Sequence, residues 1–314
     1  MSSLHRDYST YDSCRVEVCL CNMATAVTYE FQCKHFGFTD VTPKHFYESQ
    51  WTERKEYFVV YRAIMFLYCL IWAIYDTNFC VSSYPGYYIT HLSSWGEWTL
   101  VVHFGLALAV SMFGLIQDSD FCFKNNLERT ICCGNGNTCQ INDIKWFHNL
   151  CWVVMTAASG VSYIVTISYW CFSDNRMYSI AVNTHQHIMN SVLMTMDHLL
   201  SRVPTRYLHF VYVSLYGAVY TLFTVILHLI GIRPMKYSGT LDWTKSPEIS
   251  IVVSLGLVTV GACVIHFITF TIFKLRDLTH YRLRTSQTKS ALFSDTSSHS
   301  NKDINANERS RILQ

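Results

Sequence analysis

One stretch near the middle of the chain, residues 180–200 (IAVNTHQHIMNSVLMTMDHLL), is long enough to cross a bilayer yet carries several polar side chains. These recur at steps of three and four residues, which places them in one stripe on a single face of an α-helix. At about 1.5 Å per residue the stripe is about 27 Å long, close to the hydrocarbon thickness of a membrane. A charge in lipid costs about 2.5–3.5 kcal/mol, so we expect the stripe to face other helices. It comprises Asn183, His187, Asn190, Met194, Asp197 and Ser201.

Two interpretations of this stripe remain open. Polar residues on one helix face can join neighbouring helices through interhelical hydrogen bonds and do nothing else. Alternatively, they form a polar site inside a helical bundle. In that case we expect a network of Asn183, Asn190 and Asp197 with His103 and His228 from neighbouring segments.

Five further apolar runs surround this stretch, and the composition agrees with a membrane protein. Only 15% of the residues are charged, against about 25% in soluble proteins. The sequence therefore predicts an all-α polytopic membrane protein with six transmembrane helices in one bundle. We expect Arg62, just inside the first run, to extend back to the membrane interface. The other runs are residues 57–75, 98–116, 147–170, 207–232 and 249–273.

The distribution of Lys and Arg predicts the orientation in the membrane. The 76–97 loop has neither residue, whereas the 117–145 and 201–206 loops carry several, so both termini are predicted to be cytosolic. The 233–248 loop, with three basic residues, opposes this orientation. On the non-cytosolic side Cys80 and Cys171 would be the only cysteines, which leaves a disulfide between them open.

The same reading divides the chain into a cytosolic N-terminal segment (1–56), a six-helix transmembrane domain (57–275) and a disordered cytosolic tail (276–314). The first apolar run begins near Tyr57, so we expect it to serve as the targeting signal in the absence of an N-terminal signal peptide. No cluster of basic residues indicates nucleic-acid binding, and the lipid bilayer is the expected partner.

Three hypotheses account for the polar intramembrane residues. Thr99, one turn before His103, is a candidate nucleophile for a membrane hydrolase with a histidine base. The second hypothesis is haem binding, because histidines that face each other on neighbouring helices can ligate a haem iron. The third is a packed bundle that performs no chemistry and meets protein partners through its loops and tails. No soluble-enzyme motif is present, and we expect neither a metal nor another cofactor.

Residues 187–226 carry the motif HxMNSV…D…SRVP and resemble the rolling stone family of invertebrate membrane proteins. The resemblance extends to EFQCKHFGF (30–38), FYESQW (46–51) and LDW (241–243), and covers about residues 30–273. It implies a role in cell–cell (myoblast) fusion or differentiation. It also implies a location in the plasma membrane rather than the endoplasmic reticulum, with membrane or cell-surface proteins as partners.

A more distant resemblance is to the androgen-induced family of membrane hydrolases, which cleave fatty acid esters with a Thr and a His. The stretch SSWGEWT places that family's nucleophile on Thr99. The stretch QHIMNS matches His187 to its first histidine, but its catalytic histidine falls on Asn190, and a neutral amide cannot act as a base. The resemblance implies either that His187 serves Thr99 as the base or that hydrolysis is lost. We favour loss, and with it a non-enzymatic protein.

Overall fold

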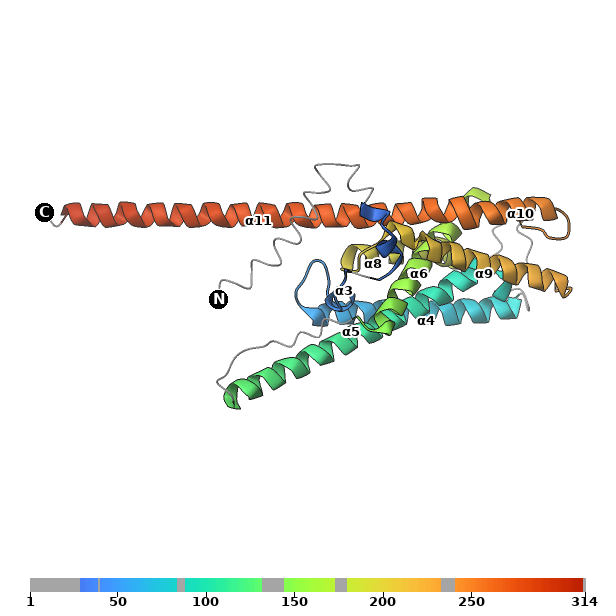
Figure 1. The fold of residues 1–314 in the computed structure, drawn as a ribbon, viewed down its shortest axis with the longest axis horizontal. Coiled ribbons are helices and arrows are strands. Elements are labelled where there is room, and N and C mark those ends of the chain that lie inside the picture. The colour runs from blue at the N-terminus through green and yellow to red at the C-terminus, as the bar shows by residue number, and fades with distance from the viewer. Residues whose placement is uncertain are drawn as a thin grey trace. The chain divides into compact units, whose positions relative to one another are not determined.

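All six apolar runs fold into helices, although one of them is less regular than the sequence predicts. The computed structural model describes residues 29–38, 40–83, 88–131, 144–172, 180–232 and 241–312, with the backbone alone for 33, 118–131, 172 and 289–312. Within these residues no strand forms, apart from an isolated bridge between Ser49 and Ser201. The long helices are α4 (Lys55–Ser83), α5 (Leu92–Ile131), α6 (Trp146–Phe172), α9 (Phe210–Leu229), α10 (Pro247–Gly256) and α11 (Ala262–Ile312) (Figure 1).

The run 180–200 is built from three pieces. Helix α7 (Ile180–Thr184) and helix α8 (Asn190–Leu200) are separated by the π-helical turn η3 (His185–Met189). A second π-helical turn, η5 (Leu257–Gly261), joins α10 to α11. Such turns carry one extra residue and occur often at functional sites. The short elements are η1 (Cys33–Phe36), α3 (Lys44–Tyr47), η2 (Tyr88–Thr90) and η4 (Tyr207–His209).

Within the residues that the structure describes, which are helical with no strand, five helices are long and apolar enough to cross a membrane, so the chain is a multi-pass membrane protein. The run 180–200 is not among them, because its polar side chains leave it much less apolar than the others. Its membrane crossing, and with it the count of six, stays a prediction. The five candidate spans are Lys55–Ser83, Leu92–Gln117, Trp146–Cys171, Tyr207–Leu229 and Pro247–Thr288.

The helices of the bundle pack in an order that follows the chain. Helix α4 lies along α5, α5 packs on α6, and α6 contacts both α8 and α9 (Figure 1). The centre of this packing is apolar and includes Phe104, Trp152 and Met194, all fully buried. Helices α6 and α9 approach closely at Gly160, where the absence of a side chain leaves room for Val213.

The segment before the first span is bound to the end of α8. The Trp51 indole donates a hydrogen bond of 2.6 Å to the carbonyl of Leu199, and the Ser49 hydroxyl donates one of 3.0 Å to that of Leu200. An ion pair of 2.6 Å joins Arg202 to Glu48. The last carbonyls of α8, which have no partner within the helix, are therefore satisfied by residues upstream of α4.

Arg62 does not extend to the interface, and this expectation was wrong. Its side chain is 1% exposed. The guanidinium donates hydrogen bonds to the carbonyls of Phe46 and Ala107 and to the Ser111 hydroxyl. Carbonyls inside the bundle thus offer Arg62 the partners that the interface would have offered, and the arginine joins α3 to α4 and α5.

The described residues from 29 to 273 belong to one compact unit, and the described residues from 274 onward lie outside it. Helix α11 continues to Ile312, and the predicted disorder of residues 276–314 stays a prediction. Cys171 is an exposed free thiol and Cys80 is buried, so no disulfide joins them.

Candidate functional site

The polar stripe of residues 180–200 lies inside the bundle. Its six side chains are all buried, and Asn190, Met194 and Asp197 are fully so. The π turn also buries two residues that lie off the predicted stripe, His185 and Gln186. The extra residue of the turn widens the set of side chains that face inward, so the inner face is more polar than helical periodicity predicts.

Two of the predicted network residues contact each other directly. His103 on α5 and Asp197 on α8 lie 3.0 Å apart between Nε2 and Oδ2, and both are buried. Next to Asp197 in the chain, the His198 ring contacts the Ser159 hydroxyl of α6 at 2.6 Å. These contacts join α8 to α5 and to α6 through interhelical hydrogen bonds.

The other network residues are distributed along the bundle. The Asn190 amide donates a hydrogen bond of 2.9 Å to the carbonyl of Gln186, one turn earlier. Asn183 is buried at the start of the segment. His228 is half-buried near the end of α9, and among the described contacts none joins it to His103 or Asp197.

Thr99 and His187 have different neighbours. The Thr99 hydroxyl contacts the Tyr216 hydroxyl on α9 at 2.9 Å and donates to the carbonyl of Trp95 at 2.7 Å. The His187 ring stacks on Tyr169 of α6, with ring centroids 3.7 Å apart. No described contact brings the two proposed catalytic residues together.

Thr99 nevertheless lines an open groove with a volume of about 700 Å³ between α5, α6 and α9. Its walls are almost entirely aromatic and aliphatic, and they include Trp95, Tyr216 and Val219. Clefts of this size and lining bind small apolar molecules. The Thr99 and Tyr216 hydroxyls supply a polar pair in its wall.

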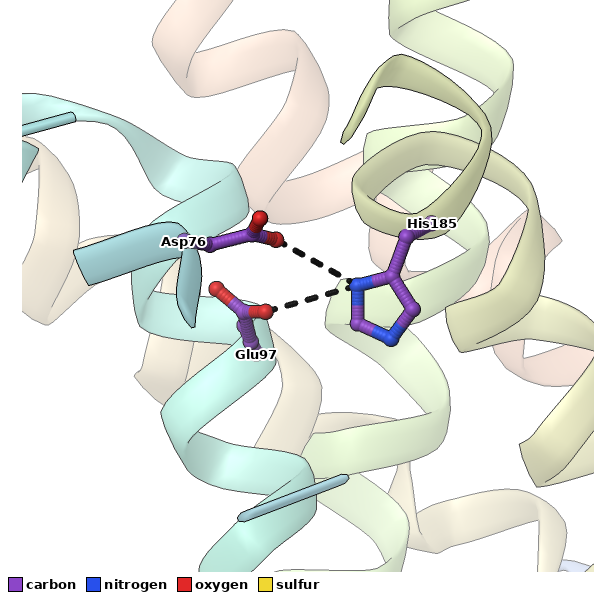
Figure 2. A group of neighbouring side chains, drawn as sticks. All are labelled: Asp76, Glu97 and His185. Carbon is purple, nitrogen blue, oxygen red and sulfur yellow. Dashed lines mark hydrogen bonds and ion pairs between the residues drawn. The ribbon is translucent and has the colours of Figure 1, made fainter. Parts of the chain in front are cut away.

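A second polar cluster, which the sequence did not reveal, lies beneath the η2 segment. Asp76 near the end of α4, Glu97 near the start of α5 and His185 at the start of the π turn converge from three helices (Figure 2). His185 Nδ1 lies 3.3 Å from Asp76 Oδ2 and 3.4 Å from Glu97 Oε1. All three side chains are at most 4% exposed. These residue types, at these distances, can hold a metal ion.

Neighbouring side chains fix this cluster in place. The His185 ring stacks on Trp72, with centroids 4.4 Å apart and planes 13° apart. The Tyr88 hydroxyl lies 3.5 Å from Glu97 Oε2 and accepts hydrogen bonds from Thr77 and Trp98. Burial raises the pKa of Tyr88 to about 12, so it stays protonated and can donate to Glu97.

Hydropathy alone could not find this cluster, although a signal for it exists. The predicted first run stops at residue 75 and the second begins at residue 98, because Asp76 and Glu97 are charged. Helices α4 and α5 continue past both residues. An acidic residue directly beside an apolar run, in each of two consecutive runs, is the signal that would have pointed to them.

Comparison with known proteins agrees with the family resemblance. The pattern of one family, described as protein rolling stone, matches residues 19–291. Protein rolling stone of Drosophila melanogaster is 26% identical over 265 residues, which make up 79% of this chain and 89% of the fly protein. No solved structure matches the chain.

Proposed function

The chain belongs to the rolling stone family, and on that premise we propose that it acts at the cell surface in cell–cell (myoblast) fusion or differentiation, without catalysing a reaction. The observation that supports a non-catalytic role is the pairing of Asp197, a stripe residue, and of the adjacent His198 with side chains on other helices. His103 with Asp197, and His198 with Ser159, use their polar atoms to hold helices together. Under this proposal the protein lies in the plasma membrane, with both termini in the cytosol.

The test is a rescue experiment in fusion-competent cells from which this protein has been removed. Two populations that carry different fluorescent proteins are mixed, and cells with both colours are counted. The unaltered chain and Thr99→Val should restore fusion equally, because the Thr99 hydroxyl serves no reaction. Asp197→Leu should restore less, since it removes the contact between α5 and α8. A failure of the unaltered chain to restore fusion would contradict the proposal.

One observation favours a second candidate function, hydrolysis of fatty acid esters. Thr99 lines an open apolar groove large enough for part of an acyl chain. A nucleophilic threonine needs a base within hydrogen-bond reach. The Thr99 hydroxyl contacts Tyr216, while His187 stacks on Tyr169, so a conformational change would have to precede the reaction.

A covalent hydrolase probe separates the two candidates. A fluorophosphonate should label the unaltered chain only if Thr99 is an activated nucleophile, and Thr99→Val should then remove the label. Thr195→Val is the matched control, because Thr195 also pairs with a tyrosine hydroxyl, that of Tyr163 at 2.7 Å. The absence of any label on the unaltered chain would remove support for the hydrolase.

A further inference from the structure

We propose that Asp76, Glu97 and His185 bind one divalent first-row transition-metal ion, with Zn²⁺ as the ion to be tested. The three side chains come from α4, α5 and the π turn, and their candidate ligand atoms all lie within 4.8 Å of one another (Figure 2). This inference does not depend on the proposed role in fusion.

The distances fit shared metal ligands better than they fit direct hydrogen bonds. Hydrogen bonds between charged groups are about 2.7–2.9 Å long. The contacts from His185 Nδ1 to Asp76 Oδ2 and Glu97 Oε1 are 3.3 and 3.4 Å. Ligands held tetrahedrally at about 2.0–2.2 Å from one zinc ion lie about 3.3–3.6 Å from each other. The two contacts therefore have the lengths of two edges of a zinc tetrahedron.

A single proton on His185 cannot serve both carboxylates well. Nδ1 carries at most one hydrogen atom, yet two carboxylate oxygens lie almost equally far from it. Glu97 Oε1 and Asp76 Oδ1 are both buried without accepting a hydrogen bond, as is Asp197 Oδ1 elsewhere in the described residues, but only in this cluster do two such oxygens lie near one histidine. Buried carboxylate oxygens are rarely left in that state, because desolvation is then uncompensated. A bound cation would compensate it.

The charges of the cluster also favour a divalent ion. Two ionised carboxylates in a protein interior need two positive charges close by. A protonated His185 supplies one positive charge, whereas a divalent ion supplies two and leaves the imidazole neutral for coordination. Oxygen ligands alone suit Mg²⁺ and Ca²⁺, but an imidazole ligand shifts the preference toward zinc and its neighbours in the first transition row.

The surroundings have the form of an outer shell around a metal site. Glu97 Oε1 faces His185, while Oε2 lies against the Tyr88 hydroxyl, so the two oxygens of this carboxylate have separate partners. The stacked Trp72 holds the imidazole plane. Groups that orient metal ligands in this way tune affinity. Three protein ligands leave a fourth position for water or another small ligand, as in catalytic zinc sites.

The pair His103–Asp197 provides a matched control within the same bundle. It also joins a histidine to a fully buried carboxylate, and Asp197 lies on the same segment as His185. However, its contact of 3.0 Å is an ordinary hydrogen bond, and within the described residues no third ligand completes a metal cluster there.

The experiment measures metal content in the full chain, purified in detergent, stripped with a chelator and refilled with Zn²⁺. Elemental analysis should find one zinc per chain in the unaltered protein and in Asp197→Asn. Asp76→Asn and His185→Gln should bind zinc at least about tenfold more weakly. Size-exclusion profiles identify variants that fail to fold. A zinc-dependent rise in the melting temperature of the unaltered chain tests the site without any substitution.

Cobalt substitution tests the ligand set. Co²⁺ bound at this site should give the visible bands of a low-coordinate nitrogen and oxygen complex, without an intense thiolate-to-cobalt band. Three results would overturn the proposal: no zinc retained by the refilled unaltered chain, equal zinc retention by His185→Gln, or a thiolate band. If the unaltered chain binds zinc as expected but does not restore fusion, the result would contradict the proposed function alone.

Discussion

The close approach of α6 and α9 gives a sharp prediction about Gly160. A Cβ atom placed on this glycine would lie 2.5 and 2.7 Å from the two γ-carbons of Val213 and 3.1 Å from its Cβ. Rotation of the Val213 side chain cannot relieve the clash, because its Cβ and both of its γ-carbons lie close to the added methyl group. In Gly160→Ala helix α9 must therefore move away from α6.

The size of the effect follows from comparison with Gly256. An added Cβ at Gly256 meets nothing within 4 Å. Both substitutions gain about 1 kcal/mol from the better helix propensity of alanine. Gly160→Ala also has to accommodate an extra methyl group in a packed interface, which typically costs about 1–3 kcal/mol. We therefore expect Gly160→Ala to be less stable than Gly256→Ala by about 1–3 kcal/mol.

The assay is thermal unfolding of both variants in the same detergent, followed by tryptophan fluorescence. For a unit of this size, a difference of about 1–3 kcal/mol corresponds to about 2–12 °C in the midpoint. In the double variant Gly160→Ala with Val213→Ala, part of the loss should be recovered, because the clashing γ-carbons are gone. If Gly160→Ala melts at or above the midpoint of Gly256→Ala, α6 and α9 do not meet as described.

Three further predictions concern buried polar groups and orientation. Asp197→Leu should destabilise the bundle by about 1–3 kcal/mol, because it leaves the buried His103 ring without its partner. Asp197→Asn should lose clearly less stability, so equal melting midpoints of the two variants would contradict this prediction. Arg62→Met should make the segment around Phe46 more sensitive to limited proteolysis, because a carbonyl there loses its donor; an unchanged cleavage rate would show that this contact is not needed. A membrane-impermeant maleimide should label Cys171 in intact cells and not label Cys171→Ser, whereas labelling only after permeabilisation would reverse the predicted orientation.

Helical periodicity predicted much of the fold, because a membrane imposes length and polarity rules that single sequences obey clearly. The runs that contain Phe104 and Trp152 are helices, and the stripe from Asn183 to Ser201 is buried. The polar residues of this stripe also explain why the run 180–200 is less hydrophobic than the five candidate spans. Periodicity could not predict the π turn, which depends on how the segment packs and not on its own pattern.

The candidate site was less predictable for two physical reasons. Asp76 and Glu97 are separated by a turn of the chain, and His185 comes from a distant segment, so no local spacing motif joins them. In addition, the π turn alters which side chains face inward, and the ideal stripe includes His187 but not His185. The sequence also could not indicate that Arg62 has carbonyl partners inside the bundle, because those carbonyls belong to α5 and to the segment before α4.

The π turn at His185–Met189 determines how the bundle responds to a gained or lost residue. A π turn takes up one extra residue while the helices on either side keep their phase, so removing one residue from 186–189 would restore a continuous α-helix and leave α7 in nearly the same orientation relative to α8. His185 would then still face Asp76 and Glu97, and Asp197 would keep its place. One residue added within α8 before Asp197 has no such turn to take it up, and it would rotate the cluster at His185 by about 100° relative to Asp197.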